Sequence, residues 1–261
     1  MKHTRRRLFY DIETSFCEGS FWRPGYNQTI HPNQILRQGQ IICISWKWEH
    51  EDEIHHLDWG IKKQCDKQLI KKFIQQLDKA DEIIAHNGDK FDIRWLRARA
   101  AYHNLTMKPA YRSIDTYKLV KRYFQLPSYR LGEVAKYFGL KAKKDPGGLE
   151  TWVDIIINKN QEALNIMIDY CDGDIATLEA IYVKIRRYIK HNLHYAVKDG
   201  DDKFMCPECK MLPKWNKTYT TAAGTIKHYM LCRNALCGQY FDINNKTYQD
   251  YLKYKVLHLV N

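Results

Sequence analysis

The sequence predicts an α/β domain followed by a small cysteine-rich module. Strand-like segments come first along the chain, and helical patterns mixed with one or two further strands follow them, which is typical of an α/β domain. A polar, glycine-containing stretch, KDGDDK at 198–203, then precedes a tail that holds two pairs of cysteines. We therefore expect two domains, at residues 1–197 and 198–261.

The first strand is expected at residues 7–14, where apolar and polar side chains alternate. Residues 15–40 contain glycine, proline and asparagine among aromatic residues, and this composition predicts a long ordered loop. Residues 40–48 and 53–59 are rich in β-branched and aromatic side chains, which favour strands.

Helical spacing begins at residues 66–80, where apolar side chains recur on one face. A short apolar strand is expected at 82–86, and the next helix near Phe91, whose ring we expect to anchor the preceding turn in the core. From Thr116 onward the pattern is mostly helical, with a charged loop at 141–148.

A long helix, which could be broken once, is expected from residue 161 to about residue 191. The chain contains neither an internal repeat nor a low-complexity tract.

Composition limits the class of protein. The chain has 261 residues, 44% of them hydrophobic, and a formal net charge of +12. Such a charge attracts polyanions, so nucleic acid is the favoured partner, although an anionic membrane surface or a merely basic soluble protein would also fit. The sequence lacks both a run of about eighteen apolar residues and the apolar stretch of a secretory signal. We expect a soluble, intracellular, cytoplasmic protein, of viral or cellular origin.

The eight cysteines fall into two groups. The scattered ones are expected to be ordinary buried or half-buried thiols: Cys17, Cys43, Cys65 and Cys171. The clustered ones predict one structural Zn²⁺ held by four thiolates: Cys206, Cys209, Cys232 and Cys237. The second pair has four intervening residues instead of two, so His228 is a possible substitute ligand, and a redox pair is the alternative to zinc.

Aromatic residues in the tail suit the short strands of a zinc ribbon: Tyr219, Tyr229, Tyr240 and Phe241. Four lysines accompany them: Lys210, Lys214, Lys217 and Lys227. The tail could bind nucleic acid, dock a protein partner or only stabilise the C-terminus, and its composition favours nucleic acid.

The larger domain contains three short motifs with carboxylate side chains. Asp11 and Glu13 lie two apart on the first strand, so both point to one face, where they repel each other unless a cation lies between them. A solvated strand face is the alternative. Asp92 ends the motif HNGDKFD, whose polar residues could instead cap a helix. Tyr170 and Asp174 share a helix face, although a core tyrosine and a surface acid would give the same spacing.

In combination and order, these motifs resemble the DEDD superfamily of 3′–5′ exonucleases, which includes the proofreading domains of DNA polymerases. The motif Asp-x-Glu matches residues 11–13, Asn-x-x-x-Phe-Asp matches 87–92, and Tyr-x-x-x-Asp matches 170–174. The histidine subtype would require His at position 169, which is Asp169 here, so the chain resembles the tyrosine subtype. The resemblance covers roughly residues 5–190 and is closest to family B polymerases.

The resemblance implies a ribonuclease-H-like fold, with a mixed five-stranded sheet flanked by helices. It implies two Mg²⁺ or Mn²⁺ ions held by four carboxylates: Asp11, Glu13, Asp92 and Asp174. Hard divalent cations prefer such oxygen ligands, and two of them about 4 Å apart can stabilise the attacking and the leaving oxygen at phosphorus. Tyr170 would orient the attacking water. The implied activity is 3′–5′ hydrolysis of single-stranded DNA, or of frayed 3′ ends, to nucleoside 5′-monophosphates.

The resemblance also places Thr14, Phe16 and Asn87 against the substrate. The aromatic residues of the following loop could instead pack it onto the domain. Asp115 resembles an acid that commonly follows the second motif in this family, but a helix N-cap role explains it equally well. His86 could touch the substrate, but a strand-end histidine with satisfied hydrogen bonds is the favoured interpretation. An exoribonuclease with the same chemistry and a non-catalytic nucleic-acid-binding module are the alternative functions.

Overall fold

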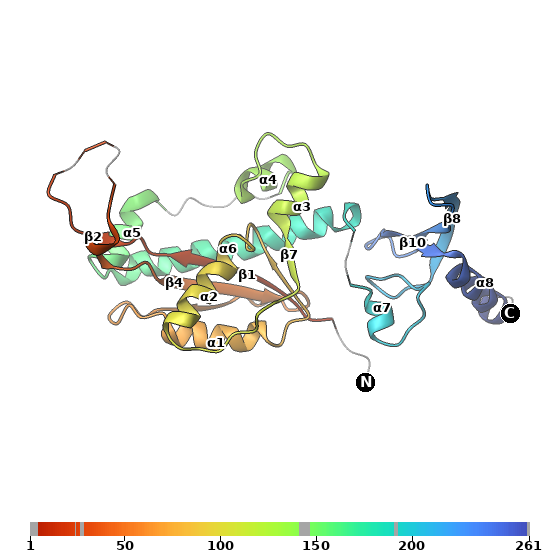
Figure 1. The fold of residues 1–261 in the computed structure, drawn as a ribbon, viewed down its shortest axis with the longest axis horizontal. Coiled ribbons are helices and arrows are strands. Elements are labelled where there is room, and N and C mark those ends of the chain that lie inside the picture. The colour runs from red at the N-terminus through yellow and green to blue at the C-terminus, as the bar shows by residue number, and fades with distance from the viewer. Residues whose placement is uncertain (1–4, 24, 27–28, 141–146, 191–192, 260–261) are drawn as a thin grey trace. The chain divides into compact units, whose positions relative to one another are not determined.

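The computed structural model describes residues 5–23, 25–26, 29–140, 147–190 and 193–259 (Figure 1). The chain forms two units, one from Arg6 to Tyr182 and the other from Val183 onward together with the residues up to Arg5. The expected domains, 1–197 and 198–261, stay a prediction. The charged loop expected at 141–148 lies largely outside the described residues.

A five-stranded sheet forms the centre of the first unit, in the order β5-β4-β1-β6-β7. The strands are β1 (Arg7–Thr14), β4 (Ile41–Trp48), β5 (His55–Asp58), β6 (Glu82–Ala85) and β7 (Ser113–Asp115). β1 pairs antiparallel with β4 and parallel with β6, while β5 is antiparallel to β4 and β7 parallel to β6. This confirms the mixed five-stranded sheet that the family resemblance implies.

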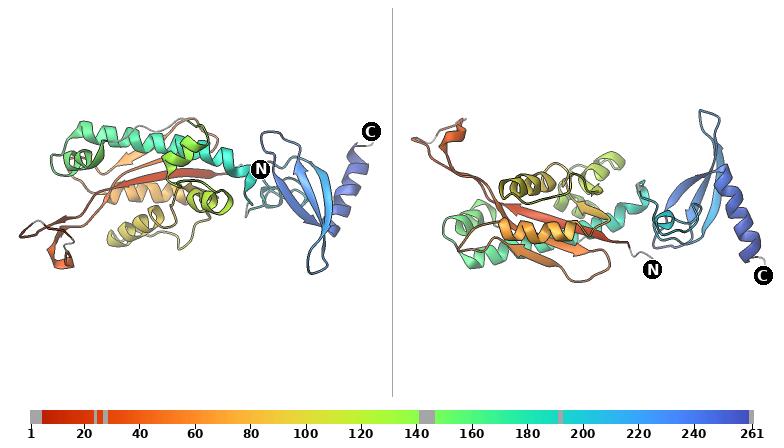
Figure 2. Two further views of the ribbon diagram at one scale, coloured as in Figure 1. Left: turned by 90° about the horizontal axis from the view of Figure 1, so that it is seen from above. Right: turned by 60° about the horizontal axis from the view of Figure 1, so that its bottom comes forward.

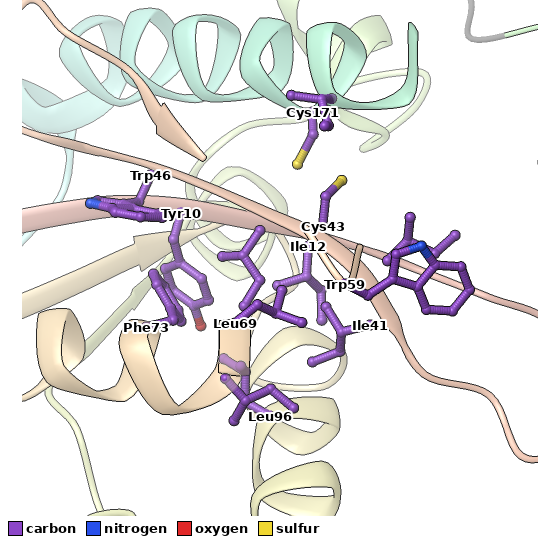
Figure 3. Close-up of a cluster of buried hydrophobic side chains, with 14 of the residues drawn as sticks. Tyr10, Ile12, Ile41, Cys43, Trp46, Trp59, Leu69, Phe73, Leu96 and Cys171 are labelled. Atoms are coloured by element: carbon purple, nitrogen blue, oxygen red, sulfur yellow. The ribbon is translucent and has the colours of Figure 1, made fainter. Parts of the chain in front are cut away.

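Helices cover both faces of the sheet because β1 is apolar on both faces along its first half. Tyr10 packs against Phe73 of α1 (Lys67–Leu77), with ring centroids 5.6 Å apart. Phe9 points to the opposite face and packs against Tyr182 of α6 (Gln161–Ile185), with centroids 5.7 Å apart. Figure 3 shows Tyr10 beside Phe73 on one side of the sheet and Cys171 on the other. Asp11 and Glu13 continue the face of Phe9, toward α6.

The remaining helices of this unit surround the sheet: α2 (Asp92–Tyr102), α3 (Thr116–Tyr123), α4 (Leu131–Tyr137) and α5 (Gly148–Ile156). The long helix α6 ends at Ile185, earlier than expected, and one 3₁₀ turn, η2 (Arg186–Tyr188), follows it. The long loop after β1 contains a small hairpin of β2 (Glu18–Gly19) and β3 (Ile35–Arg37), with a 3₁₀ turn, η1 (Pro32–Gln34), before β3.

The second unit contains a three-stranded antiparallel sheet in the order β10-β9-β8. Its elements are α7 (Tyr195–Lys198), β8 (Pro213–Thr220), β9 (Ile226–Cys232), β10 (Tyr240–Asn244) and α8 (Asn245–Leu259). Helix α8 lies along one face of this sheet (Figure 2). The small core beneath it contains Phe204, Met230, Ile243 and Tyr251. Among the described helices of the chain, none has the length and hydropathy that a transmembrane segment requires.

A buried ion cluster fixes α2 and β4 to the turn before α1. Asp66, fully buried, accepts hydrogen bonds from Arg99 Nε and Nη2 at 2.7 and 2.8 Å, and from the backbone N–H of Ile41 at 3.1 Å. His103 Nε2 lies 2.6 Å from the same carboxylate. Burial alone would raise the pKa of Asp66, but the hydrogen bonds from Arg99 and His103 outweigh it and lower the pKa.

Replacing Asp66 by alanine should destabilise the first unit by about 3–5 kcal/mol, because Arg99 would stay buried without its partner. Urea unfolding at neutral pH measures the change. The matched control is Glu133→Ala, which removes a carboxylate from an exposed i,i+3 pair with Lys136 and should change stability by about 0.5 kcal/mol or less. Equal effects of the two substitutions would contradict the role assigned to the cluster.

Candidate metal centres

Three carboxylates from β1 and α6 meet at one point. Asp11, Glu13 and Asp174 each place a possible ligand atom within 4.8 Å of the others. Alternation along β1 puts the first two on the face that α6 covers, and α6 brings the third. Asp174 is only 6% exposed, while the other two are half-buried. Like charges this close repel, and a divalent cation bound by their oxygens removes the repulsion.

The fourth predicted carboxylate lies outside this group. Asp92 is the first residue of α2, is 2% exposed, and forms a hydrogen bond with the backbone of Ile12, the residue between Asp11 and Glu13. Burial raises the pKa of Asp92 to about 7 against the lowering effect of its backbone hydrogen bonds. Its Oδ1 is buried without a hydrogen-bond partner among the described residues. A cation would fit this oxygen, since a buried carboxylate oxygen without a hydrogen-bond partner is unfavourable.

Tyr170 and Asp172 point to different sides of α6. Tyr170 is half-buried, packs against the main core and lies one turn before Asp174. Asp172 accepts a hydrogen bond from Ser45 Oγ, and its other oxygen lies 3.2 Å from His56 Nδ1. Asp172 is thus held by side chains of β4 and β5, and Ser45 is the strand neighbour of Asp11.

The turn between β6 and α2 has little space for side chains. Asn87 adopts the left-handed conformation, with φ of 66°. A Cβ on the next residue, Gly88, would lie 2.5 Å from the Cβ of Ala85 and 3.3 Å from the hydroxyl of Tyr10. Glycine at this position lets the turn approach β1, so that α2, which begins at Asp92, starts close to this strand.

Asp115 holds this turn from the end of β7. Its carboxylate accepts hydrogen bonds from the backbone N–H groups of Asn87 at 3.0 Å and Asp89 at 3.3 Å. It also caps α3 by accepting from the N–H of Lys118 at 3.3 Å. Asp115 is therefore the N-cap that the sequence indicates. It also holds the turn at Asn87, a contact between distant parts of the chain that the sequence does not indicate.

Two expectations near this turn have different outcomes. His86 is a satisfied strand-end histidine, since its ring nitrogens lie 2.9 Å from Thr116 Oγ1 and 2.8 Å from the carbonyl oxygen of Tyr129. The expected anchoring by Phe91 is wrong. Its side chain is 39% exposed and contacts the ring of Trp95 at 6.3 Å between centroids, while the neighbouring Asp92 is buried instead.

The predicted substrate contacts lie beside the carboxylates along the chain. Thr14 ends β1, and its carbonyl oxygen accepts a hydrogen bond from the indole of Trp152 at 2.9 Å. Phe16 is half-buried against the core. Further along the loop, three aromatic side chains are largely exposed and do not pack onto the unit: Phe21, Trp22 and Tyr26. Sequence reasoning missed Trp152, because nothing in its local pattern indicates a partner 138 residues away.

The four clustered cysteines form a second candidate centre. Cys206, Cys209, Cys232 and Cys237 place their sulfur atoms within 4.8 Å of one another. The sulfurs of Cys206 and Cys237 are 3.8 Å apart, and those of Cys209 and Cys232 are 3.2 Å apart. Four thiolates about 2.3 Å from one Zn²⁺ at the corners of a tetrahedron have similar separations. Three of the four side chains are buried, as in a closed structural site.

His228 does not belong to this sulfur group. Its Nδ1 lies 2.9 Å from Thr218 Oγ1, and its Nε2 lies 3.1 Å from Asn245 Oδ1. The ring also stacks on Tyr248, with centroids 3.8 Å apart. Both ring nitrogens are therefore engaged elsewhere, and the cysteines alone make up the group.

Because of the short contact with Ala85, Gly88→Ala should destabilise the first unit by about 1–3 kcal/mol, as overpacking does. Thermal unfolding measures this loss. Gly132→Ala in α4 is the control: a Cβ there meets nothing within 4 Å, so alanine should stabilise the helix by about 0.5–1 kcal/mol. A neutral Gly88→Ala variant would show that the turn is not tightly packed.

Comparison with known proteins agrees with this fold. The sequence profile of the RNase H superfamily matches residues 36–186, which is more than half of the chain. A DNA polymerase from Methanocaldococcus jannaschii is 29% identical over 150 residues, covering 46% of this chain and 9% of the polymerase. The structure of the family B DNA polymerase from the hyperthermophilic archaeon Pyrobaculum calidifontis is similar in fold, with a TM-score of 0.54 and 16% identity. That match covers 71% of this chain and 25% of the polymerase chain.

Proposed function

Since the chain belongs to the RNase H superfamily, we propose that it is a 3′–5′ exonuclease of the tyrosine subtype that hydrolyses single-stranded DNA or frayed 3′ ends. The expected products are nucleoside 5′-monophosphates. The observation that carries the proposal is the convergence of Asp11, Glu13 and Asp174, from opposite ends of the unit's sequence, on one point. The sequence similarity to a DNA polymerase supports nucleic acid as the substrate.

Four carboxylates would hold the divalent ions, Mg²⁺ or Mn²⁺. Asp11, Glu13 and Asp174 form the gathered group, and Asp92 contributes from the start of α2. When bound, a pair of such ions supplies an activated water and stabilises charge on the leaving oxygen. Asp92 and Asp174 are both buried, so their carboxylates are largely shielded from bulk water.

Other side chains would act on water and substrate. Tyr170, one turn from Asp174, would orient the attacking water through its phenol, whose usual pKa of about 10 suits it to orienting rather than abstracting a proton. Thr14 and Phe16, next along the chain from Glu13, would contact the terminal nucleotide, and so would Asn87. Recognition of the strand would be independent of sequence, because the basic chain contacts phosphates.

The tail would contain one structural Zn²⁺ bound by the four clustered cysteines. Their buried sulfur group would then replace part of the hydrophobic core that so small a unit lacks. The zinc takes no part in the hydrolysis under this proposal.

The direction of hydrolysis is tested with strands labelled at the 5′ end. With Mg²⁺ or Mn²⁺, digestion should give a ladder of progressively shorter labelled products. Immediate release of a labelled mononucleotide would indicate the opposite direction. Matched DNA and RNA strands compared in the same assay test the preference for DNA, and faster digestion of RNA would identify an exoribonuclease instead.

Asp174→Asn should lower the cleavage rate by at least about a hundredfold, because it removes a carboxylate that would hold the divalent ions. Binding of the strand should remain, since phosphate contacts are made by other residues. The matched control is Asp169→Asn, which removes the same charge from an exposed position of the same helix. Equal rates for both variants would argue against the carboxylate site.

Purified protein should contain about one equivalent of zinc by elemental analysis. Cys232→Ser should remove it and lower the melting temperature of the second unit, because metal binding contributes directly to the folding of such sites. Cys65→Ser, at an exposed thiol of the first unit, is the control and should change neither quantity. Wild-type protein that folds normally without zinc would rule out the structural role.

A further inference from the structure

One face of the second unit's sheet combines tyrosines with lysines. Pairing of the strands places nine side chains on this face, which we call the tyrosine face: Lys214, Lys217, Tyr219, Lys227, Tyr229, Leu231, Tyr240, Asp242 and Asn244. Lys214 and Lys217 are exposed, and Tyr240 is 52% exposed. Tyr219 and Tyr229 are half-buried, so the face is open to solvent along β8 and β10 and partly open along β9.

The opposite face of the same sheet is covered. There Met230 is fully buried and Ile243 is 6% exposed, and both pack in the core with Tyr251 of α8. His228 stacks on Tyr248 of the same helix. Because side chains alternate along a strand, the residues between these buried ones must point away from the helix. The exposure of the tyrosine face is thus built into the strand pattern.

The aromatic rings on the tyrosine face already form a short stack. Tyr219 and Tyr229 lie with ring centroids 4.6 Å apart and planes inclined by 21°. The Lys217 ammonium lies 5.5 Å from the centroid of the Tyr229 ring. Lys227, on the same face, pairs with Asp242 at 2.6 Å, so its charge is already compensated. A flat base could extend this stack while a lysine contacts the adjacent phosphate.

Most of the net positive charge of the chain lies in the second unit. Residues 183–261 contain fourteen lysines and arginines against six aspartates and glutamates, a balance of +8 out of +12 for the whole chain. Such a concentration of charge attracts a polyanion to this unit.

We propose that the tyrosine face binds single-stranded nucleic acid, with unpaired bases stacking on Tyr219 and Tyr229 and phosphates contacting Lys214 and Lys217. This inference rests on the proposed function only for the identity of the strand as substrate. A protein partner fits less well, because lysine is depleted in protein interfaces. A strand long enough to engage this face and the carboxylate site together would be held better than a short one.

The test measures affinity for fluorescein-labelled oligo-dT and oligo-rU by anisotropy over a series of salt concentrations. The full chain carrying Asp11→Asn is used throughout, so that the strand stays intact. Lys214→Gln/Lys217→Gln should lower affinity by about tenfold and reduce the slope of log K against log salt by about 1.4. Tyr219→Leu/Tyr229→Leu should lower affinity by about tenfold without changing the slope, because stacking releases no counterions.

Two controls separate the tyrosine face from general charge and from misfolding. Lys246→Gln/Lys253→Gln removes the same charge from exposed positions of α8 and should leave affinity within about twofold. Zinc content and melting temperature show that each variant is folded. Unchanged affinity in both tyrosine-face variants, or an equal loss in the α8 variant, would overturn the proposal, and the former would favour a protein partner.

A small substrate distinguishes failure of this inference from failure of the proposed function. The p-nitrophenyl ester of thymidine 5′-monophosphate is too short to reach a separate surface. In the background with Asp11 intact, tyrosine-face variants should hydrolyse it at the wild-type rate while digesting long strands more slowly. A chain that hydrolyses neither substrate but still loses strand affinity in these variants would refute the nuclease and retain the binding face.

Discussion

The candidate site depends on holding several negatively charged carboxylates close together. Asp11, Glu13 and Asp174 converge with oxygens within 4.8 Å of one another, and Asp92 lies buried beside the same strand. Such an arrangement is unfavourable unless a cation or protons compensate it. Burial raises the pKa of Asp92 to about 7, so the charged form of this carboxylate is also costly to hold in its position. The apolar core around these carboxylates must therefore be stable enough to offset their electrostatic repulsion.

The central strand β1 belongs to that core. Its first half is buried on both faces between α1 and α6, and its second half carries the two acids where α6 still covers them. The turn before α2 packs closely against this strand because Gly88 has no side chain, and hydrogen bonds to Asp115 hold the turn there. Asp66, paired with Arg99, fixes the far end of α2. The acids are thus positioned by rigid elements rather than by the long loop that follows them.

Local periodicity made much of this predictable. A spacing of two on a strand places Asp11 and Glu13 on one face, and a spacing of four on a helix places Tyr170 and Asp174 on one face. The four cysteines were likewise predicted to gather, because their pairing is a local pattern. The comparison with known proteins confirms the RNase H-like class of fold.

Contacts between distant residues were not predictable. The hydrogen bond of Trp152 to Thr14 and the contact of Asp115 with the Asn87 turn join segments whose own sequences show no sign of each other. Phe91 illustrates a competition that periodicity cannot settle: at the start of α2, the carboxylate of Asp92 is buried and the aromatic ring is exposed. Asp92 is buried because it faces β1, although Phe91 is the more hydrophobic of the two residues.

Manganese binding tests the central claim most directly. Titration of the full chain with Mn²⁺, followed by the electron paramagnetic resonance of the free ion, measures how many ions the carboxylates take up. We predict saturable binding of about two ions per chain, reduced in a variant that lacks the Glu13 carboxylate. Absence of saturable uptake at millimolar Mn²⁺ would contradict the account, because the clustered carboxylates would then not bind the metal.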